Sequence, residues 1–174
     1  MFLCPKVANF APTNKPHFGM RHFLLTILLA WCSLAATAQN VIIGEKVPEM
    51  RIKQWLMDLQ PEAADFTCIL FHHSESPLCR QCLEKVKGLA DNFGRRLNVV
   101  IVTKESYSKA GTTMTQHLDD RIGVAFDDNG RTFRYFGIKF IPYCVITNHK
   151  RRAVWCGNGN LLNERIIHKI ITEK

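Results

Sequence analysis

The sequence contains no run of five basic residues, no internal repeat and no linker, and its longest apolar stretch is short. That stretch, Phe23 to Ala36, falls below the ~20 residues that a membrane-spanning helix needs. The net charge is +8, but without a basic cluster this charge predicts a solvated basic surface and not a nucleic-acid interface. Hydrophobic residues make up 47% of the 174 residues, which is too many for a disordered chain and suits one domain of ordinary size.

The N-terminal segment has no acidic residue before Glu45 and follows the layout of a secretory signal peptide. Arg21 provides the positive start, the apolar stretch follows it, and Ala36-Thr37-Ala38 is a small-residue cleavage pattern before Gln39. We therefore predict export to the periplasm or cell envelope, with cleavage near Ala38-Gln39. The protein is then expected to contact the membrane only through the signal segment, and only if that segment is not cleaved.

Met20 stands directly before the positive start, and the residues that precede it add nothing to the signal pattern. We predict that translation begins at Met20 and that residues 1–19 are a mis-called extension. Residues 20–38 are then the signal peptide, and residues 39–174 form a single domain.

Cleavage reduces the seven cysteines to five, and disulfides persist in the oxidising compartments outside the cytosol. An odd number leaves at least one thiol without an intramolecular partner. The five are Cys68, Cys79, Cys82, Cys144 and Cys156. Cys32, in the apolar stretch, is an alternative site of lipid attachment, although Trp31 is a poor neighbour because such a site favours a small residue.

Two apolar runs and the segment between them predict a parallel βαβ unit. Residues 66–71 (FTCILF) and 97–102 (LNVVIV) are continuous apolar runs typical of buried strands. Between them, residues 79–93 carry apolar side chains at three- and four-residue spacing and end at Gly94, as an amphipathic helix does. A polar helical region follows, and then a β-β-α ending at residues 143–147, 153–156 and 161–171.

Cys79 and Cys82 form a Cys-x-x-Cys motif where that helix is predicted to begin. The first helical turn presents free N–H groups and the positive end of the helix dipole, which stabilise a thiolate, and Arg80 adds a positive charge. We therefore predict that Cys79 is the attacking thiolate and Cys82 the resolving thiol of thiol–disulfide exchange. The motif alone also fits half a zinc site or a structural disulfide, but its place within a βαβ unit favours redox chemistry.

Three stretches resemble the thioredoxin-like thiol–disulfide oxidoreductases of the bacterial cell envelope. They are GEKVPEM, FTCILFHHSESPLCRQC and YFGIKFIPYCVITNHKRRAVWCGN, so the resemblance covers most of the chain from Gly44 onward. It implies an α/β thioredoxin-like fold, in which helices flank a central mixed β-sheet and the Cys-x-x-Cys motif begins the first long helix. It also implies a monomeric protein-disulfide reductase with no cofactor, which acts on protein thiols or disulfides and exchanges electrons with a redox partner in the envelope.

By the same resemblance, Pro142 is a cis proline, and its loop, including Ile141, binds the substrate chain beside the cysteines. The chain departs from the family around the motif. The family usually has Trp before the first cysteine and Gly-Pro or Glu-Pro between the two, where this sequence has Leu78, Arg80 and Gln81.

Many members of the family also carry a buried acid on the strand before the motif, as a proton acceptor for the resolving cysteine, and this strand has none. The nearest titratable residues are His72, His73 and Glu75. A histidine titrates near neutral pH, so these residues are candidates for a proton relay, or else packed and surface side chains without a catalytic part.

The remaining cysteines are one in an apolar strand, Cys68, and a candidate pair, Cys144 and Cys156. Cys68 lies in a predicted buried strand and is expected to be inert. With a turn at residues 148–151, a regular hairpin places Cys144 opposite Cys156, with Cβ atoms ~4.5–5.5 Å apart, near disulfide range. We therefore predict a second disulfide or redox pair there, whereas one residue of slip leaves two separate thiols.

Two other functions stay open. His72, His73, Cys79 and Cys82 resemble a copper or zinc ligand set, with His149 as a weak distal candidate, although a nearby arginine opposes cation binding. The changed residues around the motif also fit a redox-inactive domain that binds a partner. A peroxidase is disfavoured, because no Pro-x-x-x-(Thr/Ser)-x-x-Cys pattern precedes Cys79.

The signal peptide predicts the mature N-terminus. N-terminal sequencing of the exported protein is expected to begin at or near Gln39, because cleavage follows the small-residue pattern. A mature chain that still carries residues 1–19 would contradict the assignment.

Overall fold

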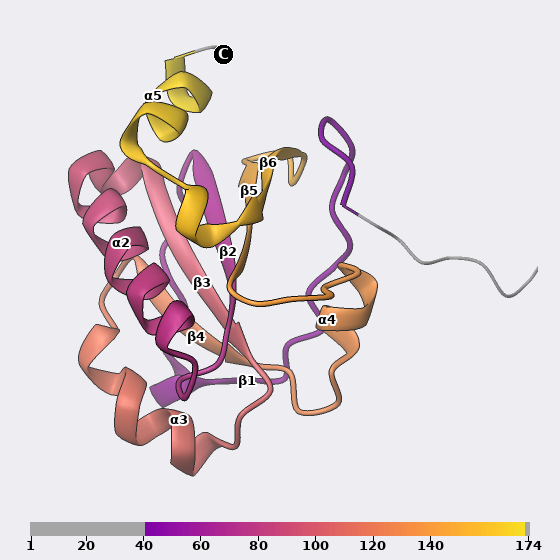
Figure 1. The fold of residues 1–174 in the computed structure, drawn as a ribbon, viewed down its shortest axis with the longest axis vertical. Coiled ribbons are helices and arrows are strands. Elements are labelled where there is room, and N and C mark those ends of the chain that lie inside the picture. The colour runs from indigo at the N-terminus through magenta and orange to yellow at the C-terminus, as the bar shows by residue number, and fades with distance from the viewer. Residues whose placement is uncertain (1–40, 173–174) are drawn as a thin grey trace, which may run out of the picture. The chain divides into compact units, whose positions relative to one another are not determined.

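The computed structural model describes residues 41–172, so the predicted signal peptide, Cys32 and the cleavage site lie outside the described residues. Six strands form one mixed sheet in the order β1-β4-β3-β2-β5-β6 (Figure 1). β2, β3 and β4 are parallel, whereas β1, β5 and β6 are antiparallel to their neighbours. The strands are β1 (Gln54–Trp55), β2 (Phe66–His72), β3 (Leu97–Thr103), β4 (Ile122–Phe126), β5 (Tyr143–Asn148) and β6 (Ala153–Asn158).

Helices cover both faces of the sheet. α2, α3 and α5 lie on one side and α4 on the other (Figure 1). α2 joins the parallel strands β2 and β3, which confirms the predicted βαβ unit and the mixed sheet flanked by helices. The helices are α2 (Pro77–Phe93), α3 (Tyr107–Met114), α4 (Arg131–Tyr135) and α5 (Glu164–Thr172), and the 3-10 turns are η1 (Leu56–Asp58), η2 (Gly94–Arg96), η3 (Thr115–His117) and η4 (Gly159–Leu161).

The central strands are apolar throughout because both of their faces are covered. Successive side chains point to opposite faces, so Cys68 and Leu70 of β2 pack toward α2, whereas Ile69 and Phe71 pack toward α4. Within the described residues, no helix is both long enough and apolar enough to cross a bilayer.

The β5–β6 hairpin contains a bulge that the sequence pattern does not reveal. Its turn is where we predicted it, with the Arg151 N–H donating to the Asn148 carbonyl at 2.8 Å. Thr147 then faces Ala153, but Ile146 faces Trp155, so Val154 is an extra residue in β6. The bulge shifts the pairing of the rest of the hairpin by one residue.

Candidate active site

The start of α2 holds the two motif cysteines. Pro77 begins the helix, where its missing N–H costs no hydrogen bond, and the Ser76 hydroxyl accepts from the Cys79 N–H at 3.3 Å. Cys79 therefore lies in the first turn of α2 and Cys82 one turn further. Both residues are 0% exposed, and both carry free thiols.

A buried carboxylate holds the loop that leads into α2. Glu105, directly beyond β3, accepts hydrogen bonds from the Ser74 N–H at 2.7 Å, from the Ser74 hydroxyl and from the Thr103 hydroxyl at 3.0 Å. The Arg80 guanidinium donates to the Ser74 carbonyl at 2.8 Å, which ties the same loop to the helix. Burial alone raises the pKa of Glu105, but the hydrogen bonds from Ser74 and Thr103 and the charge of His73 outweigh it, so this pKa lies below its ordinary value.

Glu105 was not among the residues that we predicted for the site. A signal was present, because parallel strands end at the same edge of a sheet, and His72 pairs with Thr103 at the ends of β2 and β3. An acid two residues beyond β3 is therefore expected beside the loop that follows β2.

The 3-10 turn η4 lies against the first turns of α2, which hold the motif. The Gly159 N–H donates to the Pro142 carbonyl at 3.2 Å, and the Asn160 side-chain amide donates to the Leu78 carbonyl at 3.3 Å. The Lys85 ammonium donates to the Asn160 carbonyl at 2.6 Å. These bonds hold the proline loop, η4 and the first turns of α2 together, and the Ile141–Pro142 peptide is cis, as predicted.

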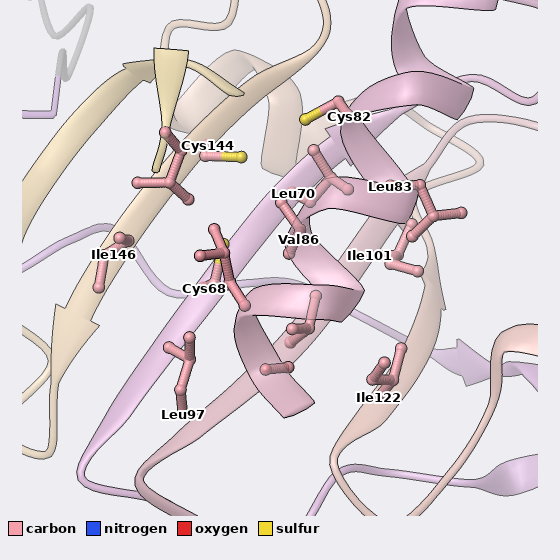
Figure 2. Packing of buried hydrophobic residues seen from close by; sticks show 14 of the residues in the cluster. Cys68, Leu70, Cys82, Leu83, Val86, Leu97, Ile101, Ile122, Cys144 and Ile146 are labelled. Carbon is pink, nitrogen blue, oxygen red and sulfur yellow. The ribbon is translucent and has the colours of Figure 1, made fainter. Parts of the chain in front are cut away.

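Three buried thiols lie in the core between the sheet and α2. Cys68 comes from β2, Cys144 from β5 and Cys82 from α2 (Figure 2). A hydrogen bond from the Cys144 thiol lowers the pKa of Cys82, against the effect of burial and with help from the Lys85 charge. Hydrogen bonds with Cys68 and Cys82, together with burial, raise the pKa of Cys144 well above its ordinary value.

The predicted pairing of Cys144 with Cys156 is wrong. Because of the bulge at Val154, Cys144 faces Gly157 and Cys156 faces Val145, so the two cysteines point to opposite sides of the sheet. Cys156 instead contacts Tyr143, whose pKa rises to about 12 because of burial and of this contact. Cys68 is buried, as expected for an inert residue, but its thiol interacts with the thiol of Cys144.

The residues predicted for a proton relay do not form one group. His72 is buried at the end of β2, and its Nδ1 atom has no hydrogen-bond partner. His73 is partly exposed, with Nδ1 3.8 Å from the Glu105 carboxylate. Glu75 is exposed and pairs with Lys109 at 2.5 Å, which lowers the pKa of Glu75. The relay therefore stays a prediction, and the groups that shift the pKa of Cys82 are Cys144 and Lys85.

Burial lowers the pKa of His72 to about 4. The charge of Glu105 opposes this shift, whereas His73, His117 and Arg80 reinforce it. His72 is therefore neutral at pH 7.

His72 and His73 do share a pocket with Ile141 of the proline loop. The pocket has a volume of about 250 Å³, and its apolar wall includes Phe140, which is 52% exposed. Lys104 and Lys139 add two positive charges to the wall. The pocket therefore offers an apolar surface with a basic border beside the predicted substrate-binding residues.

The ligand set predicted for copper or zinc is not assembled. Among residues 41–172, no group of three or more His, Cys, Asp or Glu side chains is placed to hold a metal ion. His149 lies in the β5–β6 turn, where the backbone pairs Asn148 with Arg152.

Replacing Glu105 with Gln is expected to lower the free energy of unfolding at pH 7 by about 2 kcal/mol, because a Gln amide cannot accept all the bonds that the carboxylate accepts. The folded-state pKa of Glu105 is depressed, so its contribution is complete above the ordinary carboxyl pKa and is lost as pH falls through the folded-state value. Denaturant unfolding at pH 7 and pH 4 measures both effects. Glu75→Gln, at an exposed position, is the matched control, and an equal loss in the two variants would refute this role of Glu105.

Replacing His72 with Leu is expected to flatten the loss of stability on acidification. The folded-state pKa of His72 is lowered, so the unfolded chain binds a proton first as pH falls below 6.5, and stability falls toward pH 4. Between pH 7 and pH 5 this loss is about 2 kcal/mol for the native chain and is absent from the variant. Denaturant unfolding in reducing buffer measures the difference, and parallel pH profiles would contradict it.

Comparisons with solved structures identify the fold, whereas comparisons by sequence find no match. No family model matches the chain, and no curated protein matches it by sequence. A thioredoxin-like protein from Bacteroides caccae superposes with a TM-score of 0.58 at 13% identity, over 87% of this chain and 57% of its own length, so the chain spans little more than half of that protein.

Two further solved structures cover more of their own length. A protein from Chlorobium tepidum, whose proposed identity is the thiol:disulfide interchange protein DsbE, gives a TM-score of 0.57 at 19% identity over 77% of this chain and 98% of that one. The exposed lipoprotein thioredoxin Etrx1 from Streptococcus pneumoniae gives 0.52 at 17% identity over 64% and 86%. With this likeness and the mixed sheet flanked by helices, the chain has the thioredoxin-like fold.

Proposed function

We propose that the protein is an exported thiol–disulfide oxidoreductase, with Cys79 as nucleophile and Cys82 as resolving thiol. One observation carries the proposal: both thiols lie in the first two turns of α2, directly after a buried parallel strand. Hydrogen bonds through η4 tie this part of α2 to the loop of the cis proline. Free N–H groups and the helix dipole stabilise a thiolate in that first turn.

The reaction follows from the order of the two cysteines. The Cys79 thiolate attacks one sulfur of a substrate disulfide and expels the other as a thiolate, which takes up a proton. Cys82 then loses its proton and attacks the Cys79 sulfur, so the substrate leaves reduced and the Cys79–Cys82 disulfide remains. A dithiol partner in the envelope restores the two thiols by the reverse exchange.

The burial of Cys79 sets a condition on the first step, because no substrate sulfur reaches a side chain with 0% exposure. The first turn of α2 or the covering turn η4 must shift when a substrate docks. Two exposed side chains flank this region, Leu78 at 58% and Phe140 at 52%. We propose that an extended substrate chain lies along them and along Ile141, and that Lys104 and Lys139 favour acidic side chains nearby.

Export to the cell envelope is part of the same proposal. The N-terminal pattern of positive charge, apolar stretch and small residues supports it, as does the presence of an exposed lipoprotein among the similar structures. A redox-inactive partner-binding domain is the second candidate, because both thiols are buried.

Redox titration with thiol trapping tests the proposal. In glutathione and dithiothreitol buffers, we expect a reversible two-electron transition between Cys79 and Cys82, at about −270 mV for a reductase and at about −120 mV for an oxidant. Trypsin cleaves after Arg80 and so separates the two cysteines, which makes their disulfide visible as linked peptides. Cys156→Ser, on the other face of the sheet, should leave the midpoint unchanged.

Turnover is the second readout of this test. Reduction of insulin disulfides by dithiothreitol should be accelerated by the native protein and should fall to the uncatalysed rate in Cys79→Ser. If no Cys79–Cys82 disulfide forms in any buffer, the redox function is refuted and the partner-binding domain takes its place.

A further inference from the structure

The proposed reaction uses two thiols, but the structure places a third one against the resolving cysteine. Cys144 is 0% exposed and lies on β5, two residues beyond the cis proline. Interaction with the thiols of Cys68 and Cys82 raises the pKa of Cys144, and interaction with Cys144 lowers the pKa of Cys82. Nothing in the exchange between Cys79 and Cys82 requires this neighbour.

The backbone at Gly159 shows how close the two sulfurs are. A Cβ atom added to Gly159 would lie 2.8 Å from the Cys144 Sγ and closer still to the Cys82 Sγ. Both sulfurs therefore border one small space that the missing side chain leaves open. Figure 2 shows the two side chains pointing toward each other across it, Cys82 from α2 and Cys144 from β5.

The third thiol of the cluster is less suited to a bond with Cys144. Leu70 lies opposite Cys144 and Cys68 lies opposite Ile146, so Cys68 and Cys144 are diagonal neighbours on β2 and β5. Diagonal neighbours have Cα atoms ~7–8 Å apart, beyond the ~4.4–6.8 Å that a disulfide spans. Cys82 approaches Cys144 from the helix above the sheet, and its Sγ borders the same space as the Cys144 Sγ.

We propose that Cys144 is a third redox thiol, which attacks the Cys79–Cys82 disulfide at Cys82 and forms a buried Cys82–Cys144 disulfide. The proposal rests on the redox function of the Cys79–Cys82 pair. In this step the Cys79–Cys82 bond breaks, the Cys82–Cys144 bond forms, and the proton that Cys144 loses passes to Cys79. No electrons are gained or lost, so no external oxidant is required.

The exchange frees the nucleophile in a protein that is still oxidised. Cys79 becomes a thiol able to attack a substrate disulfide, while the oxidising equivalent is stored between Cys82 and Cys144. Such a state can rearrange substrate disulfides without a prior reduction step. Because the pKa of Cys144 is raised, its thiolate is scarce at neutral pH, and the exchange should accelerate as pH rises.

The first experiment uses the full chain with Cys79→Ser. After oxidation with glutathione disulfide, which takes up the two electrons and two protons, we expect a mass loss of two hydrogen atoms and a link between residues 81–85 and residues 140–150 after trypsin digestion. These tryptic peptides contain Cys82 and Cys144 as their single cysteines, so the link is unambiguous. Cys79→Ser/Cys156→Ser should behave identically, and Cys79→Ser/Cys144→Ser should lose the link.

The second experiment uses the native chain and involves no core substitution. The Cys79–Cys82 form is incubated between pH 7 and pH 9 and trapped with N-ethylmaleimide at intervals. We expect oxidised molecules with alkylated Cys79 and linked Cys82 and Cys144, which appear about tenfold faster per pH unit.

The outcomes separate this proposal from the proposed function. A Cys79–Cys82 disulfide that forms reversibly but never yields the Cys82–Cys144 link, in either experiment, overturns the role of Cys144 and leaves the redox function intact. A link between Cys68 and Cys144 in its place also overturns it. Failure of the Cys79–Cys82 disulfide itself refutes the two-cysteine function and overturns the exchange step with it, even if the link forms in Cys79→Ser.

Discussion

The backbone of Gly159 lies so close to α2 and β5 that any side chain at this position would collide with the thiols of Cys82 and Cys144. This close approach brings together the first turns of α2, the strand that follows the cis proline and the turn after β6. Hydrogen bonds from Gly159 to Pro142 and from η4 to Leu78 hold the contact in place. The environment of the Cys82 sulfur therefore depends on a segment about 80 residues away along the chain.

A second constraint acts on the loop that enters α2. The Glu105 carboxylate accepts hydrogen bonds from Ser74 and Thr103 in a place where an unpaired charge would be costly. His72, beside it, is neutral because burial outweighs the attraction of that carboxylate. The loop is thus held by a buried carboxylate and neighbours a buried neutral base, and acidification destabilises the fold through both groups.

The thiol of Cys144 lies beside Cys82, and the strand that precedes α2 has no acid. That strand is β2, and the interaction that lowers the pKa of Cys82 comes from the thiol of Cys144. A thiol is a weaker donor than a carboxylic acid, but it is also able to form a covalent bond. The arrangement that lowers the pKa of the proposed resolving cysteine therefore places a further sulfur atom beside it. Among residues 41–172, no cluster of His, Cys, Asp or Glu side chains is placed to hold a metal ion.

The sequence alone determined the local elements and the place of the motif. Continuous apolar runs predicted β2 and β3, because strands covered on both faces are apolar throughout, and the three- and four-residue spacing after Cys79 predicted α2. Resemblance predicted the cis bond before Pro142. Only the tertiary structure decided which thiols meet. One extra residue at Val154 turned Cys156 to the other face, because strand side chains alternate with a period of two, and left Cys144 facing α2. A bulge of this kind depends on how the hairpin packs against the rest of the sheet, so a local sequence pattern does not reveal it. The approach of Cys82 to Cys144 brings α2 and β5 together at η4, and these elements are far apart in the sequence.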